Sequence, residues 1–438
     1  EEEEKTGGES KRQQLNLVSR ESYDELTVFQ AAPLVCYRDD GDFHPLDFLD
    51  FDAERKLLTK YLEETDRNSV CLKLDFQVAT TERLGDFLAS GKAQVIHFSC
   101  HGEKDCLALE DGKGCADIVT PDALKGLFDA GQKKPQFVVV AACHSESTGQ
   151  AFIDAGIPHV LCCEKDSELM NKAAMKFSRH LYQFLASGRT LSESFELAKE
   201  TVRHDPFIKN PELEVEKYIL LPKNGNHDVK IFFPRQVTSS ASSRPATSRL
   251  FPHLYLPPFH GDLSGRGKDI FKVLQKLSPL GKLIKIRGEI GSGVRSIAEA
   301  VARYISMREH SFSIDEVIWF PFWQQPNNSD AFLCTLKGLS GFLEGGGLAG
   351  LSKSTAGNYE YDRLWTQLCK CLEEKNVLFV VDPKELPLDH SICAFLSDIF
   401  GRIGVKSVSV ILVCESEGGF DSSVDIGCTE AEVNVVSL

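Results

Sequence analysis

The chain has 438 residues, of which 42% are apolar and 26% are charged, and its formal net charge of -15 comes from 64 acidic and 49 basic side chains. This length predicts two or three domains, any of which can bury a full-sized core. No segment approaches the run of about 18 apolar residues that a membrane-spanning helix needs, and the acidic balance repels phosphate backbones, so we expect neither a membrane nor nucleic acid as a partner.

The opening run EEEEKTGG lacks the basic start and the apolar segment of a secretory signal. Because the first residue is Glu1 rather than Met, we expect a piece of a longer protein. The fourteen cysteines form no CxxC pair, and several lie inside apolar segments: Cys36, Cys162, Cys163 and Cys414. This usage predicts reduced thiols in a cytoplasmic protein, without a disulfide framework or a structural metal site.

Two segments without apolar periodicity interrupt the sequence. Residues 1–24 are charged and aperiodic, and residues 236–252 open with QVTSSASSRPATSR, which is dominated by Ser, Thr and Ala. Such composition is typical of a disordered terminus and a flexible linker. It divides the chain into a predicted first domain over 25–235 and a predicted second domain over 253–438.

Apolar runs in the first domain alternate with amphipathic patterns. The runs that predict strands are 26–36, 70–76, 94–100, 136–143 and 159–163. Helices are predicted over 52–64 and 170–188, and a further helix begins with the capping-box pair Thr190 and Glu193. This alternation predicts an α/β fold with a mainly parallel sheet flanked by helices.

Two of these strands end at a side chain that can do chemistry. QVIHFSC runs into His101, and QFVVVAA runs into Cys143. Sites in an open parallel sheet form just past the carboxyl ends of the strands, so a histidine and a cysteine placed there can face one substrate. A thiol with an ordinary pKa of about 8.5 is mostly protonated at neutral pH, and a nearby histidine can activate it and later protonate a leaving amine. The pair predicts nucleophilic catalysis.

The neighbours of this pair have their own expected roles. Gly102 lacks a side chain, so its N–H can approach a substrate carbonyl and form an oxyanion hole with the N–H of Cys143. His97 lies in the apolar run before His101 and is predicted to be a core histidine. The alternative for the whole pattern is structural, because buried cysteines are common and a histidine before a glycine often only ends a strand.

The two strand ends and their surroundings resemble the CHAT domain, a branch of the caspase and separase group of cysteine peptidases. The similar segments are APLVCYRDDGDFHPLDFLDFDAERKLL, FQVATTERLGDFL, VIHFSCHG, VVVAACHSESTGQAFIDAGIPHVLCC and MKFSRHLYQFLASGRTLSESFELAKE. The resemblance implies a caspase-like fold and an endopeptidase that cuts protein substrates without metal or cofactor. It maps the catalytic histidine onto His101 and the nucleophile onto Cys143. His144 and Ser145 depart from the caspase pattern after the nucleophile, which we interpret as a subfamily difference.

Peptidases of this group build the specificity pocket after the strand that follows the nucleophile, where this chain has Asp166 and Glu168. If one of them lines the pocket, a basic side chain before the scissile bond is favoured. His144 adjoins the nucleophile and is a further candidate to contact substrate. The alternative for the two acids is a solvated helix N-terminus that they stabilise.

The second domain also alternates strands with helices. Four of its segments resemble the P-loop core of STAND signalling NTPases, which include NB-ARC and NACHT modules. These segments are LIKIRGEIGSGVRSIAEAVARYI, EVIWFPF, VLFVVDPKE and SVSVILVCES. The resemblance implies ATP and Mg²⁺ as ligands and a phosphate loop that contains Gly288, Gly291 and Gly293.

The loop departs from that pattern at the residues that carry charge. Val294 stands at the lysine position and Arg295 at the magnesium ligand. A shift by one residue gives these roles to Arg295 and Ser296 but makes the loop one residue too long. Asp382 ends a strand where the magnesium-associated acid belongs, followed by Pro383 instead of a second acid. The segment Cys414-Glu415-Ser416 also lacks an expected arginine, so we predict a degenerate module in which ATP and Mg²⁺ are doubtful ligands.

Together the patterns predict an intracellular caspase-like cysteine endopeptidase coupled to a regulatory STAND-like module in a signalling protein. Its expected partners are protein substrates and either regulatory proteins or further copies of the chain. Two alternatives stay open: a non-enzymatic signalling scaffold in which both domains have lost their chemistry, and a switch controlled by nucleotide.

Overall fold

The structure is a computed structural model of the chain. It describes residues 24–66, 72–92, 94–131, 133–168, 171–233, 265–321, 366, 369–370, 372–383, 396–401, 407–415 and 429–435. The predicted linker over 236–252 and all but the last residue of the predicted terminal segment over 1–24 lie outside the described residues.

The chain divides into two compact units. The first unit comprises Glu1–Gln30, Asp50–Leu107 and Val119–Ser248. The second unit comprises Ala31–Leu49, Ala108–Ile118 and Arg249–Leu438. Two short segments from within the predicted first domain are thus grouped with the second unit. The domain limits drawn from the sequence, at 25–235 and 253–438, stay a prediction.

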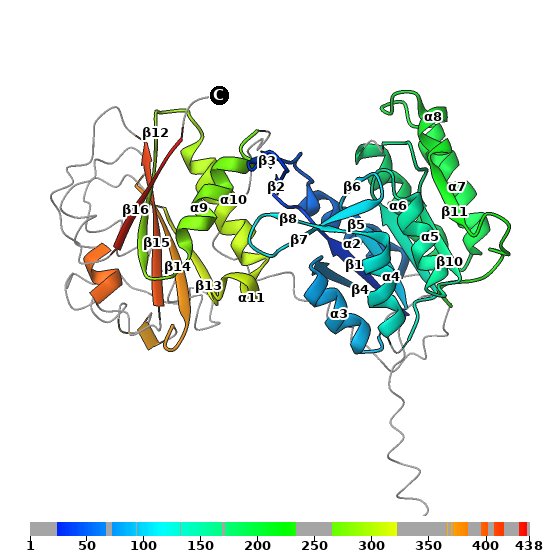
Figure 1. The fold of residues 1–438 in the computed structure, drawn as a ribbon, viewed down its shortest axis with the longest axis horizontal. Coiled ribbons are helices and arrows are strands. Elements are labelled where there is room, and N and C mark those ends of the chain that lie inside the picture. Colours follow the sequence, from blue (N-terminus) through cyan, green and yellow to red (C-terminus); the bar gives the residue numbers. More distant parts are fainter. Residues whose placement is uncertain are drawn as a thin grey trace, which may run out of the picture. The chain divides into compact units, whose positions relative to one another are not determined.

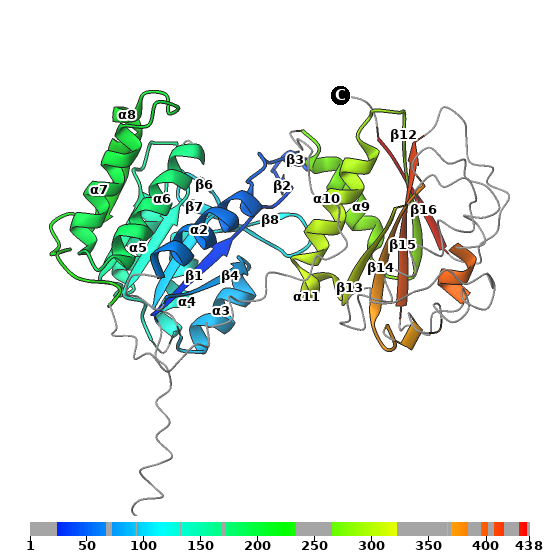
Figure 2. The same ribbon diagram turned by 180° about the vertical axis from the view of Figure 1, so that it is seen from behind.

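The first unit is built on a six-stranded sheet in the order β11-β10-β9-β5-β1-β4 (Figures 1 and 2). Its strands are β1 (Asp24–Gln30), β4 (Leu72–Val78), β5 (Val95–Ser99), β9 (Phe137–Ala141), β10 (His159–Cys163) and β11 (Tyr218–Leu221). β11 is antiparallel to β10, and the other neighbours run parallel. The predicted mainly parallel sheet is confirmed.

Helices cover both faces of this sheet. One face packs against α2 (Phe51–Asp66), α6 (Asn171–Ala186) and α7 (Leu191–Arg203). The other face packs against α3 (Thr81–Ala89), α4 (Pro121–Ala130) and α5 (Glu146–Asp154). Alternate strand residues point to opposite faces, so Val28 belongs to the first core and its neighbour Phe29 stacks on Phe98 in the second. The capping box predicted at Thr190 and Glu193 is present at the start of α7.

Shorter elements lie in the same stretch of sequence, and some of them belong to the second unit. They are α8 (Pro211–Glu216), the pair β2 (Val35–Tyr37) and β3 (Phe43–Pro45), and the three-stranded sheet of β6 (His101–Glu103), β7 (Cys106–Glu110) and β8 (Ala116–Val119). β6 is the continuation of the chain after β5, so the small sheet begins at His101.

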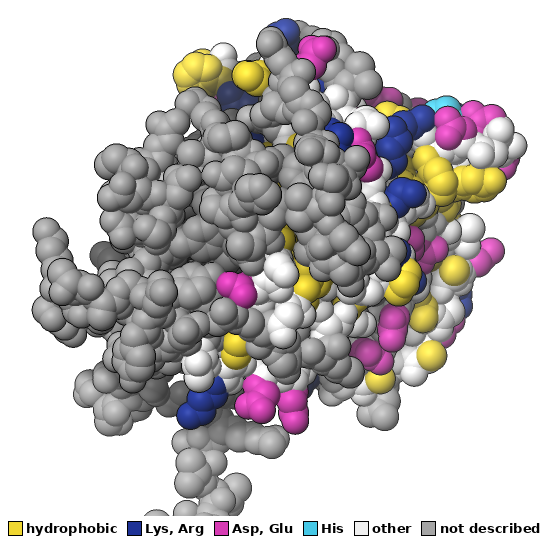
Figure 3. Space-filling view, turned by 90° about the vertical axis from the view of Figure 1, so that its left-hand side faces the viewer, with side chains coloured by type: hydrophobic (Ala, Val, Ile, Leu, Met, Phe, Trp, Pro, Cys, Tyr) yellow, Lys and Arg dark blue, Asp and Glu magenta, His cyan; other side chains and the backbone are white. Residues whose placement is uncertain are grey.

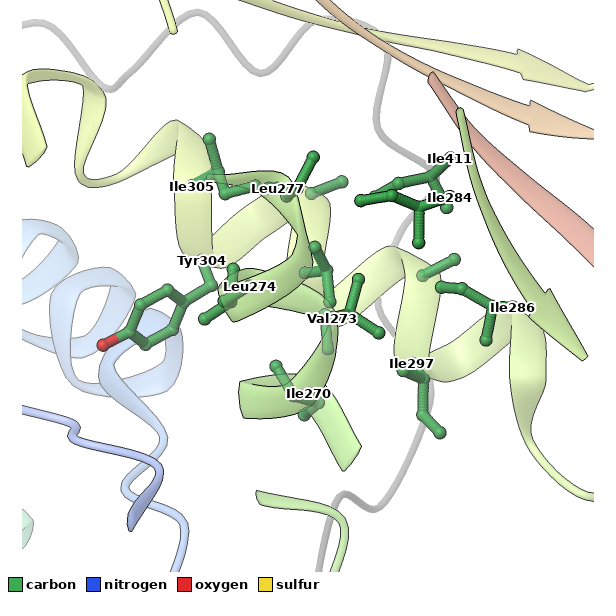
Figure 4. Close-up of a cluster of buried hydrophobic side chains, with 14 of the residues drawn as sticks. Ile270, Val273, Leu274, Leu277, Ile284, Ile286, Ile297, Tyr304, Ile305 and Ile411 are labelled. Atoms are coloured by element: carbon green, nitrogen blue, oxygen red, sulfur yellow. The ribbon is translucent and has the colours of Figure 1, made fainter. Parts of the chain in front are cut away.

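The second unit contains a five-stranded parallel sheet in the order β13-β14-β15-β12-β16. Its strands are β12 (Lys282–Gly288), β13 (Glu316–Pro321), β14 (Asn376–Asp382), β15 (Ser407–Glu415) and β16 (Thr429–Asn434). Its helices are α9 (Gly267–Leu277), α10 (Val294–Ser306) and α11 (Glu309–Phe312). Figure 4 shows side chains of α9 and α10, such as Ile270 and Ile297, packed with Ile284 and Ile286 of β12. This is the second α/β, P-loop-like domain that the sequence predicts.

A buried ion pair holds the segment Ala108–Ile118 within the second unit. Arg308 donates to both carboxylate oxygens of Glu110, at 2.5 Å from Nε and 2.6 Å from Nη2, and the two side chains are 3% and 0% exposed. The Tyr304 hydroxyl donates to the same carboxylate at 3.0 Å, and the Ala32 N–H donates at 2.6 Å. Since burying an isolated charge is costly, these partners are what allow the carboxylate to be there.

Charged side chains of both signs lie among the described residues on the face drawn in Figure 3, with Lys and Arg interspersed between Asp and Glu. Within the described ranges, no helix has the length and apolar character that crossing a bilayer requires.

Candidate active site

His101 and Cys143 follow neighbouring strands at the same edge of the first sheet. β5 and β9 are parallel partners, with Ser99 opposite Ala141 in the register. His101 comes two residues after Ser99, and Cys143 comes two residues after Ala141. The two predicted catalytic residues therefore leave the sheet at matching positions, where both are partly exposed.

Gly102 brings the two strand ends into close contact. A Cβ atom on this residue would lie 2.0 Å from the carbonyl oxygen of Cys143 and 3.1 Å from the Cβ of Ala142. No side chain fits that space, so the glycine lets the backbone after His101 pass directly beside the backbone of the nucleophile. The part its N–H plays in an oxyanion hole stays a prediction.

A tight turn presents Cys143 just before α5. His144 has a φ of 53°, in the left-handed region that residues other than glycine seldom adopt. Ser145 is buried, and its hydroxyl donates to the Ala142 carbonyl at 2.8 Å and accepts from the Cys163 N–H at 2.9 Å. The two residues that depart from the caspase pattern thus shape the turn that carries the nucleophile.

The segment after β10 is bonded to this turn. The His144 N–H donates to the Ser167 carbonyl at 3.0 Å, and its Nδ1 donates to the Lys165 carbonyl at 2.9 Å. The Lys165 N–H in turn donates to the Glu146 carboxylate at 3.2 Å. These bonds place the segment that contains Asp166 beside the nucleophile.

The two acids proposed for a substrate pocket are held differently. Asp166 lies 3.3 Å from Lys104, three residues after His101, and the two side chains are 75% and 69% exposed. Glu168 is exposed and is held through its carbonyl, which accepts from Lys217 Nζ at 2.7 Å. Asp166 therefore lies between the nucleophile segment and the segment after the histidine, where an incoming basic group would compete with Lys104 for it.

The other cysteines near the site are buried in the core. Burial raises the pKa of the Cys163 thiol to about 12, and it raises the pKa of Cys100 and Cys162 still further from the ordinary value. A thiol in that state is a poor nucleophile, because the thiolate is the reactive form. These three cysteines are therefore core residues.

His97 is a core residue, as the sequence predicts. It is 0% exposed, and its Nδ1 lies 2.7 Å from the Tyr182 hydroxyl. Burial lowers its pKa to about 3, so the imidazole is neutral at physiological pH. A ring without access to solvent cannot exchange a proton with a substrate, so His97 is excluded as the proton carrier.

In the second unit, the loop between β12 and α10 is packed into the domain. α10 begins right after Gly293, and both Gly291 and Gly293 have a φ of 84°, as a tight loop before a helix requires. Val294 is 0% exposed and belongs to the hydrophobic core. Gly288 is packed against Ser292 and Val294, since a Cβ there would lie 2.4 Å from the Ser292 hydroxyl oxygen.

Arg295 is paired with the acid that a magnesium ion would need. Its Nε donates to Asp382 Oδ2 at 2.8 Å and its Nη2 donates to Oδ1 at 3.2 Å, while Asp382 is 2% exposed. Ser296 is half-buried on α10. With an apolar side chain at the lysine position and a guanidinium on the buried acid, the residues present do not fit Mg²⁺ and ATP. The side chain of Glu415 and all of Ser416 lie outside the described part.

Comparison with known proteins settles the family. The model of the CHAT domain matches residues 7–244, which is more than half of the 438 residues. The chain belongs to the CHAT family. CHAT domains are of the caspase-like peptidase class, which agrees with the first sheet and with the placement of its strand ends. No curated protein matches the chain.

Likeness to solved structures is distant. One similar structure is the Orc1 protein of Aeropyrum pernix in complex with DNA, at 18% identity and a TM-score of 0.30, covering 39% of this chain and 45% of that one. Another is PCH-2 of C. elegans, at 18% identity and a TM-score of 0.24, covering 39% and 38%. A third is Cdc6p of Pyrobaculum aerophilum, at 12% identity and a TM-score of 0.28, covering 43% and 48%. The chain spans less than half the length of each, and such low scores carry no argument.

Sequence reasoning missed one buried polar residue of this CHAT domain that lies close to the site. Glu54 is 6% exposed on α2, and its carboxyl accepts from Gln30 at the end of β1. The signal was its spacing: Glu54 is four residues before the buried Leu58 and so falls on the apolar face of its helix.

Proposed function

We propose that the CHAT region of this chain is a cysteine endopeptidase in which Cys143 is the nucleophile and His101 transfers the proton. The observation that carries the proposal is the matching exit of the two residues from β5 and β9, with Gly102 against the Cys143 backbone. This arrangement puts a partly exposed thiol and an imidazole past the ends of neighbouring strands. Membership in the CHAT family supports the same class of chemistry.

The proposed reaction needs two acyl transfers. The Cys143 sulfur, its proton taken by His101, attacks the peptide carbonyl and forms a tetrahedral oxyanion. That oxyanion collapses as the C–N bond breaks, and His101 gives its proton to the leaving amine, which leaves a thioester on Cys143. Water then attacks the thioester while His101 accepts its proton. The thiol is regenerated and the carboxylic acid product departs.

The N–H groups of Gly102 and Cys143 are the proposed donors to the oxyanion. The close backbone contact between these residues supports a rigid placement of both groups. Preorganised donors cost no reorganisation when charge develops, and they commonly supply a large part of the rate enhancement. Asp166 is the proposed acid of the substrate pocket, with His144 and Glu168 as further candidates on the same side of the nucleophile.

We propose a regulatory role without nucleotide hydrolysis for the second unit of this cytoplasmic signalling protein. The ion pair of Arg295 with Asp382 supports this, because it neutralises the acid that would hold a metal. The same ion pair leaves a non-enzymatic scaffold open as an alternative function of the chain. A protein that has lost the catalytic residues of one domain can also lose those of the other. Protein substrates and regulatory partners are the proposed ligands.

The test is labelling of the full chain with an electrophilic peptide probe, together with cleavage of a peptide library. We expect covalent labelling at Cys143, and we expect Cys143→Ala and His101→Ala to abolish cleavage while the chain stays folded. Removing the nucleophile of a catalytic unit commonly costs on the order of 10⁴ or more in rate. Residual cleavage above about a hundredth of wild type in Cys143→Ala contradicts the assignment.

Two matched variants complete the test. Cys106→Ala removes another half-buried cysteine of the same unit and should leave cleavage unchanged. His97→Gln should lower stability and keep the chemical step. A His97→Gln protein that folds normally but cannot cleave would mean that the wrong histidine was chosen, and a wild-type chain that takes no label at Cys143 would favour the scaffold.

A further inference from the structure

A buried polar cluster lies under the carboxyl ends of β1 and β5, and the proposed reaction does not use it. Glu54 is 6% exposed and Gln30 is 1% exposed. Gln30 Nε2 donates to Glu54 Oε2 at 2.5 Å, and the Ser99 hydroxyl donates to the same carboxyl. Arg55 Nε donates to Gln30 Oε1 at 2.6 Å. Glu54 is therefore bonded to the last residues of two neighbouring strands at once.

The register shows where these bonds lie with respect to the dyad. Gln30 is opposite Ser99 across β1 and β5, and Ser99 is opposite Ala141 across β5 and β9. These residues form the last row of the sheet, two positions before His101 and Cys143. The sheet face with Gln30 and Ser99 packs against α2, which carries Glu54, and against α6, which carries Tyr182.

Burial and the neighbouring groups act on the pKa of the Glu54 carboxyl in opposite directions. Burial raises its pKa above the ordinary value, against the lowering effects of the bonds from Gln30 and Ser99 and of the charge of Arg55. His97 Nε2 lies 3.8 Å from Glu54 Oε1, and burial keeps that imidazole neutral. Among the described residues, the other titratable groups that face the cluster are the buried Cys100 thiol and the Tyr182 hydroxyl, which lies on the far side of His97.

We propose that Glu54 is a positioning residue for the dyad, because it fixes the end of β5 against β1 and so sets the distance between His101 and Cys143. The inference rests on the proposed function, since it requires that His101 activates Cys143. A buried carboxyl suits this task, because it accepts hydrogen bonds from the last residues of both strands. Displacing a catalytic group by about 1 Å can cost on the order of a hundredfold in rate.

The test follows the reactivity of Cys143 toward iodoacetamide in the full chain as a function of pH, with the modified peptide quantified by mass spectrometry. We expect a wild-type midpoint below the ordinary thiol value of about 8.5, because the histidine favours the thiolate. Glu54→Ala and Ser99→Ala should raise the midpoint by about one pH unit and slow alkylation at pH 7 on the order of tenfold. Glu54→Gln should stay within about twofold of wild type, since its amide oxygen can accept the same two hydrogen bonds.

The control variant is Tyr182→Phe. It removes a hydroxyl from the far end of the same cluster, so it lowers stability without touching the strand ends, and the midpoint should not move. If Glu54→Ala does not fold, Ser99→Ala and Glu54→Gln carry the test, because both change little volume. A shift in Tyr182→Phe as large as that in Ser99→Ala would indicate general loosening and overturn the inference.

His101→Ala separates this inference from the proposed function. If His101→Ala leaves the midpoint unchanged, the dyad itself is wrong. If His101→Ala raises the midpoint while Glu54→Ala and Ser99→Ala leave it in place, the dyad stands and the role of Glu54 is overturned. A midpoint in Glu54→Gln that moves as far as in Glu54→Ala also overturns it, because a charge effect would then replace positioning.

Discussion

Each of the two units ends its parallel strands in side chains that can do chemistry, but the outcomes differ. In the first unit His101 and Cys143 follow adjacent strands and are partly exposed, and burial raises the pKa of the Glu54 carboxyl behind them. In the second unit the guanidinium of Arg295 covers the buried acid Asp382, and Val294 is in the core. The strand edge of the first unit thus leaves two reactive side chains accessible, whereas at the edge of the second unit a buried acid and a guanidinium neutralise each other.

The largest effect that would sharpen this contrast is expected from Gly102→Ala. The new Cβ would lie 2.0 Å from the Cys143 carbonyl oxygen, so the two strand ends must move apart by about 1 Å or more. We expect the rate of probe labelling at Cys143 to fall on the order of a hundredfold or more, with the thermal unfolding temperature only moderately lower. The measurement is a time course of labelling at several probe concentrations.

A matched control is Gly126→Ala on α4, where a Cβ would meet nothing within 4 Å. It should leave labelling unchanged and stabilise the helix by roughly 0.5–1 kcal/mol. If Gly102→Ala is labelled as fast as wild type, the ends of β5 and β9 are not as close as the first sheet indicates. The first unit would then lack the close strand ends that distinguish it from the second.

Five of the six strands of the first sheet and four of the five strands of the second were predictable from local pattern alone, and β11 and β16 were not predicted. Continuous apolar runs such as 136–143 and 159–163 can be read without knowledge of their partners, because a strand buried on both faces is apolar throughout. The two strand-end residues were predictable for the same reason, since each apolar run stops at a polar or reactive side chain. Family resemblance then singled out His101 and Cys143 from the other histidines and cysteines.

The rest depends on contacts between segments far apart in sequence. The P-loop resemblance assigns Arg295 and Asp382 to one magnesium site, but the ion pair that they form across 87 positions cannot be predicted from either segment. The need for glycine at 102 follows from the register of β5 with β9, which periodicity within one strand does not set. The grouping of Ala108–Ile118 with the second unit follows from a partner for Glu110 that lies 198 positions away.

A smaller effect is expected from acid acting on His97 in the first unit. His97 has a folded-state pKa of about 3 against an ordinary value of 6.5, so below pH 6.5 the unfolded chain binds a proton that the folded chain refuses. Stability should therefore fall as the pH drops from 6.5 toward 3, by at most about 1.4 kcal/mol per pH unit from this group. Glu54 acts in the opposite sense, because its raised pKa favours the folded state as the pH falls.

The variant His97→Gln isolates the histidine contribution, since it leaves Glu54 in place. Urea unfolding followed by circular dichroism should show a steeper loss of stability below pH 6.5 in wild type than in His97→Gln. The second unit has its own probe, because Trp319, Trp323 and Trp365 all belong to it and Trp319 is buried. Tryptophan emission should report the same transition in both proteins. Equal pH slopes by circular dichroism would mean that His97 is not buried as a neutral group.

The smallest effect concerns nucleotide. Val294 supplies no ammonium for a triphosphate, and Arg295 faces any metal with a like charge while it occupies Asp382. Millimolar ATP with Mg²⁺ should therefore stabilise the second unit by no more than about 0.4 kcal/mol, which is the value for a dissociation constant equal to the ligand concentration. For a unit of this size that is a thermal shift of about 1–2 °C at most, followed by tryptophan emission.

The double variant Val294→Lys with Arg295→Ser tests the physical reason for that small effect. It rewrites the loop as GEIGSGKS, which restores the lysine and the hydroxyl of a phosphate loop and releases Asp382. If the paired charges are what silence the site, this variant should bind ATP with Mg²⁺ and show a shift of several degrees, since a ligand at about 100 times its dissociation constant stabilises by roughly 2.7 kcal/mol. Arg295→Ser alone, which frees the acid without supplying the lysine, is the matched control. A contrary result would be a thermal shift of several degrees in the wild-type chain together with ATP turnover that disappears in Arg295→Ala. It would show that Arg295 and Ser296 take the lysine and hydroxyl positions of a phosphate loop that is one residue longer. The second unit would then be a switch controlled by nucleotide and not a regulatory module that works without it.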